Sequence, residues 1–145
     1  MWLFSSMTQQ DAARTLVLCG GLAMTWSTIV GFLMLVPMQP WAQGIIPNFN
    51  IKHMGAAHLD WIVLALMLGL AAGVIVYFDL QPTTAAIIAL CTGAWLNPLP
   101  YVFRSFGINA FVLGGSMTQR AAATLGLISS LLLLYGWLSI LSQTL

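Results

Sequence analysis

The chain has 145 residues, of which 60% are hydrophobic and 5% are charged, and its formal net charge is +1. Its mean hydropathy is +0.95. Because soluble domains carry about 25% charged residues, this composition excludes a molecule whose surface faces water throughout. The small net charge gives no basis for binding nucleic acid. The expected partner of the surface is therefore the lipid bilayer.

Four apolar runs follow one another along the chain, and each has roughly the 20 residues that a helix needs to cross a bilayer. They occupy residues 15–36, 61–78, 83–103 and 121–141. Inside lipid, backbone polar groups must be satisfied within their own segment, so each run predicts a helix. The sequence thus predicts an all-α integral membrane protein with one domain over residues 1–145. It is a four-transmembrane-helix bundle with spans at about 12–36, 56–79, 83–103 and 119–142.

An even number of spans places both termini on one side of the membrane, here named side A. The loops at residues 37–55 and 104–117 then lie on the opposite side, named side B. The turn at residues 79–82 is short, so spans two and three form an antiparallel hairpin. The residues before the first run lack the basic start of a cleavable signal.

Three cations are expected near side B, namely Lys52, Arg104 and Arg120, whereas Arg14 is expected near side A. Cytoplasmic loops carry an excess of Lys and Arg, so this distribution predicts that side B faces the cytoplasm. We expect a multi-pass protein of the inner (plasma) membrane of the cell.

Two glycines on span two, Gly69 and Gly73, have the GxxxG spacing that lets helices approach closely in lipid. The motif fits packing within the bundle, and it also fits self-association through span two. Four short helices leave little room for a private cavity, which favours a ligand site between copies of the chain. Cys19 and Cys91 fall inside apolar runs and are expected to be small apolar residues, not a disulfide or a metal pair.

Ionisable side chains inside a span are costly and often mark function. The chain has two histidines and three carboxylates. His58 and Asp60 stand together where span two begins, and Asn97, Tyr101 and Arg104 stand where span three ends. Span two begins on side B and span three ends there. All five residues are therefore expected near the same membrane face, with His58 beside Asn97 and Tyr101.

A helix that begins near Gly55 places His58 about one turn from its start, and Asp60 then lies about 200° round the helix from His58. We therefore expect no direct pair between them. Asp60 is expected to meet a neighbouring helix, a loop or a side-B cation. An alternative is that both residues mark the headgroup interface, beside Trp61 of an aromatic belt. His53 is expected to be a solvated loop residue.

The end of span three carries Pro98 and Pro100, which remove backbone donors and disfavour helix at the residue before each of them. We expect a kinked or loosened helix there, which is tolerated at membrane depth only beside protein or a polar cavity. Asn97, Tyr101 and Arg104 share an approximate helical stripe. The alternative is an interfacial Tyr/Arg anchor followed by a proline stop.

The sequence contains no GxSxG, HExxH or CxxC motif and no carboxylates paired at helical spacing, so a hydrolase is poorly supported. An imidazole, a phenol and an amide beside an apolar cleft suit a cofactor that brings its own chemistry. Haem needs an axial histidine, an apolar slot and cations for its propionates. The candidates are His58 as the ligand to iron, and Lys52, Arg104 and Arg120 as partners of the propionates.

Two motifs carry a resemblance to a known family. The pair Ala57-His58 opens span two, and the pattern WxNxxxYxF at residues 95–103 closes span three. Together with the four-span plan, they make nearly the full chain resemble the small membrane isomerases that include styrene oxide isomerase and hydroxylaminobenzene mutase. The acidic residue in the stretch AHLD resembles the mutase branch. The spacing of the second motif resembles the epoxide isomerase branch.

The resemblance implies a homotrimer that holds haem b between subunits, with His58 as the axial ligand. It implies that ferric iron acts as a Lewis acid on the oxygen of an aromatic or apolar epoxide, with no net redox change. The ring opens to a carbocation, and a hydride shift then gives an aldehyde. Tyr101 is expected to position the substrate oxygen, and a water-poor pocket protects the cation.

One position departs from the pattern of the family, because Leu64 stands where the family carries an asparagine six residues after the histidine. Either Asn97 or Asp60 takes over its role, or the substrate is different. Tyr101, Asn97 and Asp60 are therefore the candidate catalytic residues. The nearest alternative function is a mutase that moves the hydroxyl of an aryl hydroxylamine to its ring. The others are a haem electron carrier and a cofactor-free membrane assembly protein.

Overall fold

The computed structural model of the protein describes residues 5–42 and 49–145, so residues 43–48 of the first side-B loop lie outside it. The helices are α1 (Gln9–Leu33), α2 (Ile51–Tyr77), α3 (Thr84–Leu96), α4 (Leu99–Ser105) and α5 (Met117–Leu141), with 3-10 turns η2 (Val36–Met38) and η3 (Pro40–Ala42). The segments long and apolar enough to cross a membrane are Gln9–Met38, Ile51–Tyr77, Thr84–Ser105 and Met117–Leu141. The predicted four-helix membrane bundle is confirmed.

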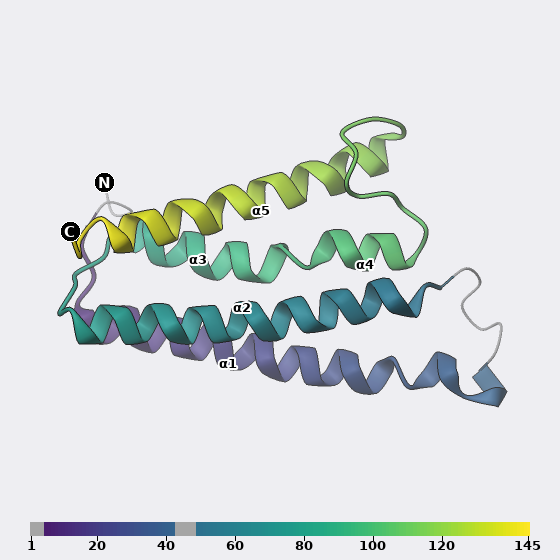
Figure 1. Cartoon of the computed structure of the whole chain (residues 1–145), viewed down its shortest axis with the longest axis horizontal. Coiled ribbons are helices and arrows are strands. Elements are labelled where there is room, and N and C mark those ends of the chain that lie inside the picture. The colour runs from purple at the N-terminus through teal and green to yellow at the C-terminus, as the bar shows by residue number, and fades with distance from the viewer. Residues whose placement is uncertain (1–4, 43–48) are drawn as a thin grey trace.

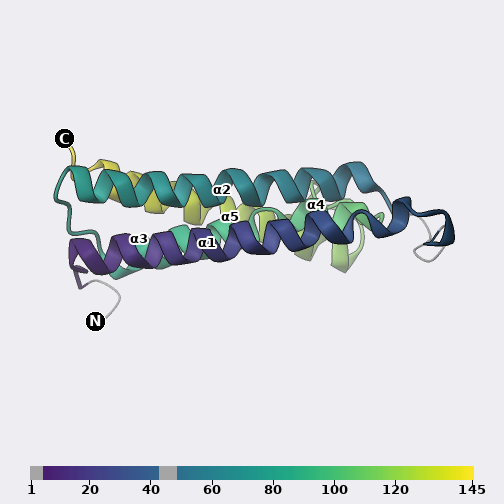
Figure 2. The same ribbon diagram turned by 90° about the horizontal axis from the view of Figure 1, so that it is seen from below.

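The bundle consists of two helix pairs. One pair is α1 with α2, and the other is α5 with α3 and its continuation α4 (Figure 1). A view from below again shows α1 and α2 side by side (Figure 2). The start of α1 and the end of α5 lie at the same end of the bundle as the turn between α2 and α3. The predicted placement of both chain ends on side A is therefore confirmed.

Each of the four long helices begins at a residue whose side chain accepts a hydrogen bond from a backbone N–H of the first turn. These residues are Thr8, Asn50, Thr83 and Ser116. The first N–H groups of a helix have no partner within the helix, so such caps stabilise its start. The caps fix where each span begins, and with it the depth of every side chain that follows.

The start of α2 differs from the expectation. Asn50 caps the helix and α2 begins at Ile51, not near Gly55. His58 therefore lies about two turns into the helix instead of one. His53 belongs to the first turn and is half-buried, so the expectation of a solvated loop residue is wrong. Both histidines are held by regular helix.

The third span is broken, as its prolines predict. α3 ends at Leu96 and α4 begins at Leu99, with Pro98 as the residue before α4. Asn97 and Pro98 both keep right-handed helical dihedral angles, so the chain continues in nearly the same direction. The break changes the local hydrogen bonding, because the N–H of Tyr101 donates to the carbonyl of Pro98 over 3.1 Å.

Close helix contacts rest on glycines other than the GxxxG pair. A Cβ at Gly93 of α3 would lie 2.9 Å from the backbone oxygen of Ser129 on α5, and a Cβ at Gly20 of α1 would lie 2.9 Å from that of Ala65 on α2. A Cβ at Gly69 or Gly73 would meet nothing within 4 Å. The GxxxG motif therefore does not pack within the described chain, and its small-residue face points outward.

The apolar core lies between the two pairs. It includes Leu16, Leu68, Leu90 and Ile140, all nearly inaccessible. Leu64, which departs from the pattern of the resembled family, is 4% exposed and belongs to this core. The free cysteines Cys19 and Cys91 pack against it as partly buried residues. Both are small, partly buried residues in apolar surroundings, as expected.

Candidate functional site

His58 faces α1, where Ser27 holds its ring. Nδ1 of the imidazole lies 2.8 Å from the backbone oxygen of Ser27 and 2.8 Å from its Oγ. The Ser27 hydroxyl in turn donates to the backbone oxygen of His58 over 2.7 Å. Ser27 is itself fully buried. Two helices of one pair are thus joined through a single serine and a single histidine.

These contacts determine which nitrogen of His58 carries the proton. A carbonyl oxygen has no hydrogen to give, so at 2.8 Å Nδ1 must donate to the oxygen of Ser27. In the neutral ring Nε2 then keeps its lone pair. Within the described residues Nε2 has no hydrogen-bond partner. Every fully buried polar side-chain atom among these residues has a partner, so Nε2 cannot be fully buried.

Gly31 makes the space for the ring. A Cβ at Gly31 would lie 3.1 Å from Cε1 of His58 and 3.6 Å from each ring nitrogen. Any side chain at position 31 would therefore press on the imidazole edge. Sequence reasoning did not link Ser27 or Gly31 with His58, since they are 31 and 27 residues away on another span.

Asp60 lies on another side of α2 and meets the second helix pair. Nδ2 of Asn97 donates to a carboxylate oxygen of Asp60 over 3.1 Å. The hydroxyls of Ser129 and Ser130 on α5 donate to Oδ1 of Asn97 over 3.1 and 3.2 Å. Each hydroxyl shares its hydrogen with the backbone oxygen of Gly126. Asn97, at the break in the third span, therefore connects α2 with α5.

This geometry tests the expectations for the polar set. Asp60 meets a neighbouring helix and not His58, as predicted from their angular separation. The expectation that His58 lies beside Asn97 is wrong for a single chain, because its ring turns to α1 while Asn97 lies on the Asp60 side of α2. Tyr101 packs against the cluster of Val30, Ala57 and Trp61. The physical reason is the 200° between positions 58 and 60, which one helix cannot close.

Tyr101 and Asn97 share a cavity of about 380 Å³ between α4, α5 and the loop that joins them. Ser130 also lines it, together with apolar residues such as Leu127. The ring of Phe111 from the loop packs edge-on against Tyr101, with centroids 5.1 Å apart. The cavity therefore combines an apolar wall with an amide, a phenol and a hydroxyl. Ser129 and Ser130 were not expected from the sequence, which contains many serines in apolar runs.

A second cavity, also of about 380 Å³, is almost wholly apolar. It is lined by residues of α1, α2 and α4, among them Trp26, Met54, Trp61 and Val102. Trp61 is 3% exposed, and its indole N–H donates to the backbone oxygen of Trp95 over 3.3 Å. The alternative that Trp61 belongs to an interfacial aromatic belt is therefore wrong.

The three expected cations of side B, Lys52, Arg104 and Arg120, are all exposed. The guanidinium of Arg104 lies 5.4 Å from the ring centroid of Phe111 and also lines a shallow polar depression with His53. No ion pair joins any two described residues, so Asp60 has no cation partner among them. The structure places none of the three cations against the ring of His58.

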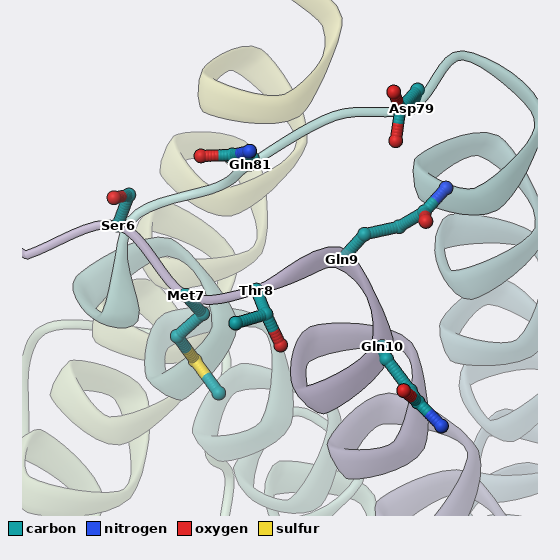
Figure 3. A pocket seen from close by; sticks show the side chains of 7 residues that line it. All are labelled: Ser6, Met7, Thr8, Gln9, Gln10, Asp79 and Gln81. Atoms are coloured by element: carbon teal, nitrogen blue, oxygen red, sulfur yellow. The ribbon is translucent and has the colours of Figure 1, made fainter.

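The polar cavity on side A contains none of the candidate residues. It is lined by the segment before α1, the start of α1 and the turn after α2, and Figure 3 shows Gln9 reaching toward the end of α2. Nε2 of Gln9 donates to the carbonyl of Val76 over 2.9 Å. Asp79 forms the turn with a φ of 53°. These contacts cap the C-terminal end of α2 and give the cavity a structural explanation.

The described residues contain no group of three or more His, Cys, Asp or Glu side chains that could hold a metal ion. His58 by itself fits a metal centre in which a macrocycle supplies the other ligands. Comparisons of the chain with models of protein families, with curated proteins and with solved structures found no match. The functional argument therefore rests on the residues themselves.

Proposed function

We propose that this protein is a membrane-bound, haem b-dependent isomerase that rearranges an aromatic or apolar epoxide to a carbonyl compound. The observation that carries the proposal is the state of the His58 ring. Nδ1 donates to a backbone carbonyl, and Nε2 is left with a free lone pair. Histidines that ligate metals commonly hold their second nitrogen in this way, which fixes the tautomer and the ring orientation.

The chemistry of the cofactor and that of the chain divide as follows. Ferric haem on His58 would supply a Lewis acid for the epoxide oxygen. The chain would supply a dry apolar surface, which protects a developing carbocation from water. Tyr101 and Asn97 carry the donors that can orient a substrate oxygen, and both line the same cavity. Of the three exposed cations expected at the propionates, we assign Lys52 and Arg120 and leave out Arg104, because its guanidinium lies against the ring of Phe111.

A homotrimer is part of the proposal, and the outward face of α2 supports it. Gly69 and Gly73 are exposed on α2 and lie within about 60° round the helix of His58, whose ring itself turns toward α1. A Cβ at either glycine would meet nothing within 4 Å, so a second copy can approach closely there. An interface of this kind would cover Nε2 of His58 and would bring donors from a neighbouring copy to a haem held between subunits.

The mutase alternative keeps one specific observation in its favour. Asp60 is an acid inside a span, hydrogen-bonded to Asn97 and without a cation. Such a carboxyl group can carry a proton for a substrate whose oxygen leaves as water or hydroxide, which an aryl hydroxylamine requires and an epoxide does not. Comparing conversion of an aryl epoxide with that of an aryl hydroxylamine by the same preparation would separate the two functions.

The experiment is a visible absorption spectrum of the full chain purified in detergent. We expect a Soret band in the wild type and in His53→Ala, which removes the other histidine, and no band in His58→Ala. A wild type that binds no haem would overturn the proposal. A band that survives His58→Ala would overturn the ligand assignment, and a low-spin bis-histidine spectrum would favour an electron carrier. Turnover of an aryl epoxide should need no stoichiometric reductant.

A matched pair of glycine variants tests the ring geometry without removing the ligand. Gly31→Ala adds a Cβ 3.1 Å from Cε1 of His58, whereas Gly21→Ala on the same helix meets nothing within 4 Å. We expect haem affinity to fall roughly tenfold in the first variant, which is the size of effect known for groups that orient metal ligands, and to stay unchanged in the second. Equal affinities, measured by haem titration, would show that His58 does not hold the haem in this orientation.

A further inference from the structure

A shallow depression on side B contains hydrogen-bond donors and no acid. It has a volume of about 340 Å³ and is lined by Asn50, His53, Arg104, Gly107 and Asn109. These residues come from the start of α2, the end of α4 and the loop that follows α4. We call this depression the donor pocket.

The backbone builds the donor pocket by joining two helix ends. The N–H of Asn50 donates to the carbonyl of Ser105 over 2.8 Å, which ties the start of α2 to the end of α4. Gly107 then takes a φ of 84°, a conformation that side chains disfavour, and its N–H donates back to the carbonyl of Arg104. This reversal carries the chain across the pocket to Asn109.

The two asparagine side chains of the pocket have N–H donors without partners. Oδ1 of Asn50 accepts from the N–H groups of Lys52 and His53, and Oδ1 of Asn109 accepts from the N–H of Phe111. The side-chain NH₂ groups of both asparagines have no partner among the described residues. Each asparagine therefore has its acceptor occupied and its two donors free.

Arg104 adds a full charge to these donors. Its guanidinium has no carboxylate partner in the described part of the chain, and it lies against the ring of Phe111. Guanidinium groups bind phosphate through two parallel hydrogen bonds, and amide donors can reach the remaining oxygens. A phosphodiester suits this arrangement, because its two charged oxygens can accept from the guanidinium and, through their remaining lone pairs, from the amides.

The pocket also lies at the level where such an oxyanion is abundant. It is formed where α2 begins and α4 ends, which are the side-B ends of two membrane-crossing segments. Phospholipid headgroups occupy this depth of a bilayer, and anionic lipids attract Lys and Arg there. His53 is about 140° round α2 from His58, so the pocket does not face the proposed haem ligand of its own chain.

We propose that the donor pocket binds the phosphate group of an anionic phospholipid on side B. Arg104 makes the charged contact, and the amides of Asn50 and Asn109 complete it. The assignment does not depend on whether the protein binds haem, because no pocket residue touches His58. Lys52 and Arg120 remain available for haem propionates.

The test is native mass spectrometry of the delipidated full chain in detergent, titrated with phosphatidylglycerol. Diacylglycerol with the same acyl chains lacks the phosphate, and glycerol 3-phosphate lacks the acyl chains. Arg104→Gln removes the guanidinium from the pocket. Arg120→Gln is the matched control, because it removes the same charge from an exposed side-B residue outside the pocket. Asn109→Ala removes an amide while leaving the net charge unchanged.

We expect phosphatidylglycerol affinity to fall about tenfold or more in Arg104→Gln, because a hydrogen bond to a charged group is lost. Asn109→Ala should lose several-fold, and Arg120→Gln should stay within twofold of the wild type. Equal losses in the two arginine variants would overturn the pocket in favour of nonspecific attraction. Equal binding of diacylglycerol would overturn phosphate recognition, and competition by glycerol 3-phosphate at equal concentration would overturn the lipid as its source. Joint loss of haem and lipid in Arg104→Gln would overturn the separation of the two sites.

Discussion

The two helix pairs of this bundle differ in the continuity of their helices and in the polar contacts that join them. In the α1–α2 pair both helices are unbroken, and the main polar contact is the ring of His58 on the backbone of Ser27. In the other pair the third span is interrupted at Asn97, whose side chain takes hydrogen bonds from two serines of α5. The first pair leaves Nε2 of His58 without a hydrogen-bond partner among the described residues, whereas in the second pair the side chains of Asn97, Ser129 and Ser130 bond to one another.

The difference separates a group that is free to bind from groups that hold the fold. Polar side chains inside a bilayer find partners because the alternative is an unsatisfied group in hydrocarbon. Asn97 satisfies three neighbours at once and connects the pairs through Asp60. Nε2 of His58 has no such partner among the described residues, so it is a better candidate than Asp60 or Asn97 for binding a ligand that the chain itself does not supply.

The largest expected effect comes from the contact between α3 and α5. A Cβ at Gly93 would lie 2.8 Å from Cγ of Leu133 and 2.9 Å from the backbone oxygen of Ser129. Backbone cannot move aside cheaply, so Gly93→Ala should lower the free energy of unfolding by about 1–3 kcal/mol. The measurement is denaturant unfolding in detergent, followed by circular dichroism. Gly21→Ala, with open space round the new methyl, is the control and should be neutral or slightly stabilising.

If Gly93→Ala proved as stable as Gly21→Ala, the second pair would not be held by close backbone contact. The two helix pairs would then differ only in how their polar groups are bonded. The haem spectrum, which depends on the first pair, should be little changed in folded Gly93→Ala protein. This readout separates damage to the scaffold from damage to the proposed ligand.

A smaller effect is expected from the link between the two pairs. In a double-mutant cycle with Asp60→Ala and Asn97→Ala, the coupling energy should be about 0.6 kcal/mol and at most about 1.7 kcal/mol, the average and the maximum measured for hydrogen bonds between membrane helices. Each single variant should also leave haem affinity close to that of the wild type, because neither residue contacts the ring of His58. A coupling near zero would show that Asp60 and Asn97 act separately, and the hydrogen bond would then not connect the pairs.

The sequence predicted the fold better than it predicted the partners of the polar residues. Long apolar runs dictate spans because lipid forces helix, and the prolines at positions 98 and 100 dictate the break. The start of α2 was missed because residues 51–54 include a lysine and a histidine, which look like loop, whereas Asn50 supplies a cap that extends the helix. Hydropathy reports the membrane segment and not the full helix.

The angles between positions on a helix predicted only part of the arrangement of the candidate site. They correctly separated His58 from Asp60 and sent Asp60 to a neighbouring helix. They could not say which span stands against each face, so Ser27 and Gly31 were not anticipated and Asn97 was expected beside the histidine. For the same reason the GxxxG motif left both packing within the bundle and self-association open, and the structure removes only the first of them. Those facts depend on how the two pairs dock.

The smallest expected effect is also the sharpest test of the His58 ring. Ser27→Ala removes the hydroxyl that lies 2.8 Å from Nδ1, but the backbone oxygen at 2.8 Å remains. Since that carbonyl alone suffices to keep the proton on Nδ1, we expect the haem spectrum to be unchanged. The free energy of unfolding should stay within about 0.5 kcal/mol of the wild type, because alanine has a higher helix propensity than serine. Loss of haem in folded Ser27→Ala protein would show that the hydroxyl, and not the carbonyl, sets the tautomer. Nε2 would then not be reserved by the helix backbone, and the contrast between a free group in the first pair and satisfied groups in the second would fail.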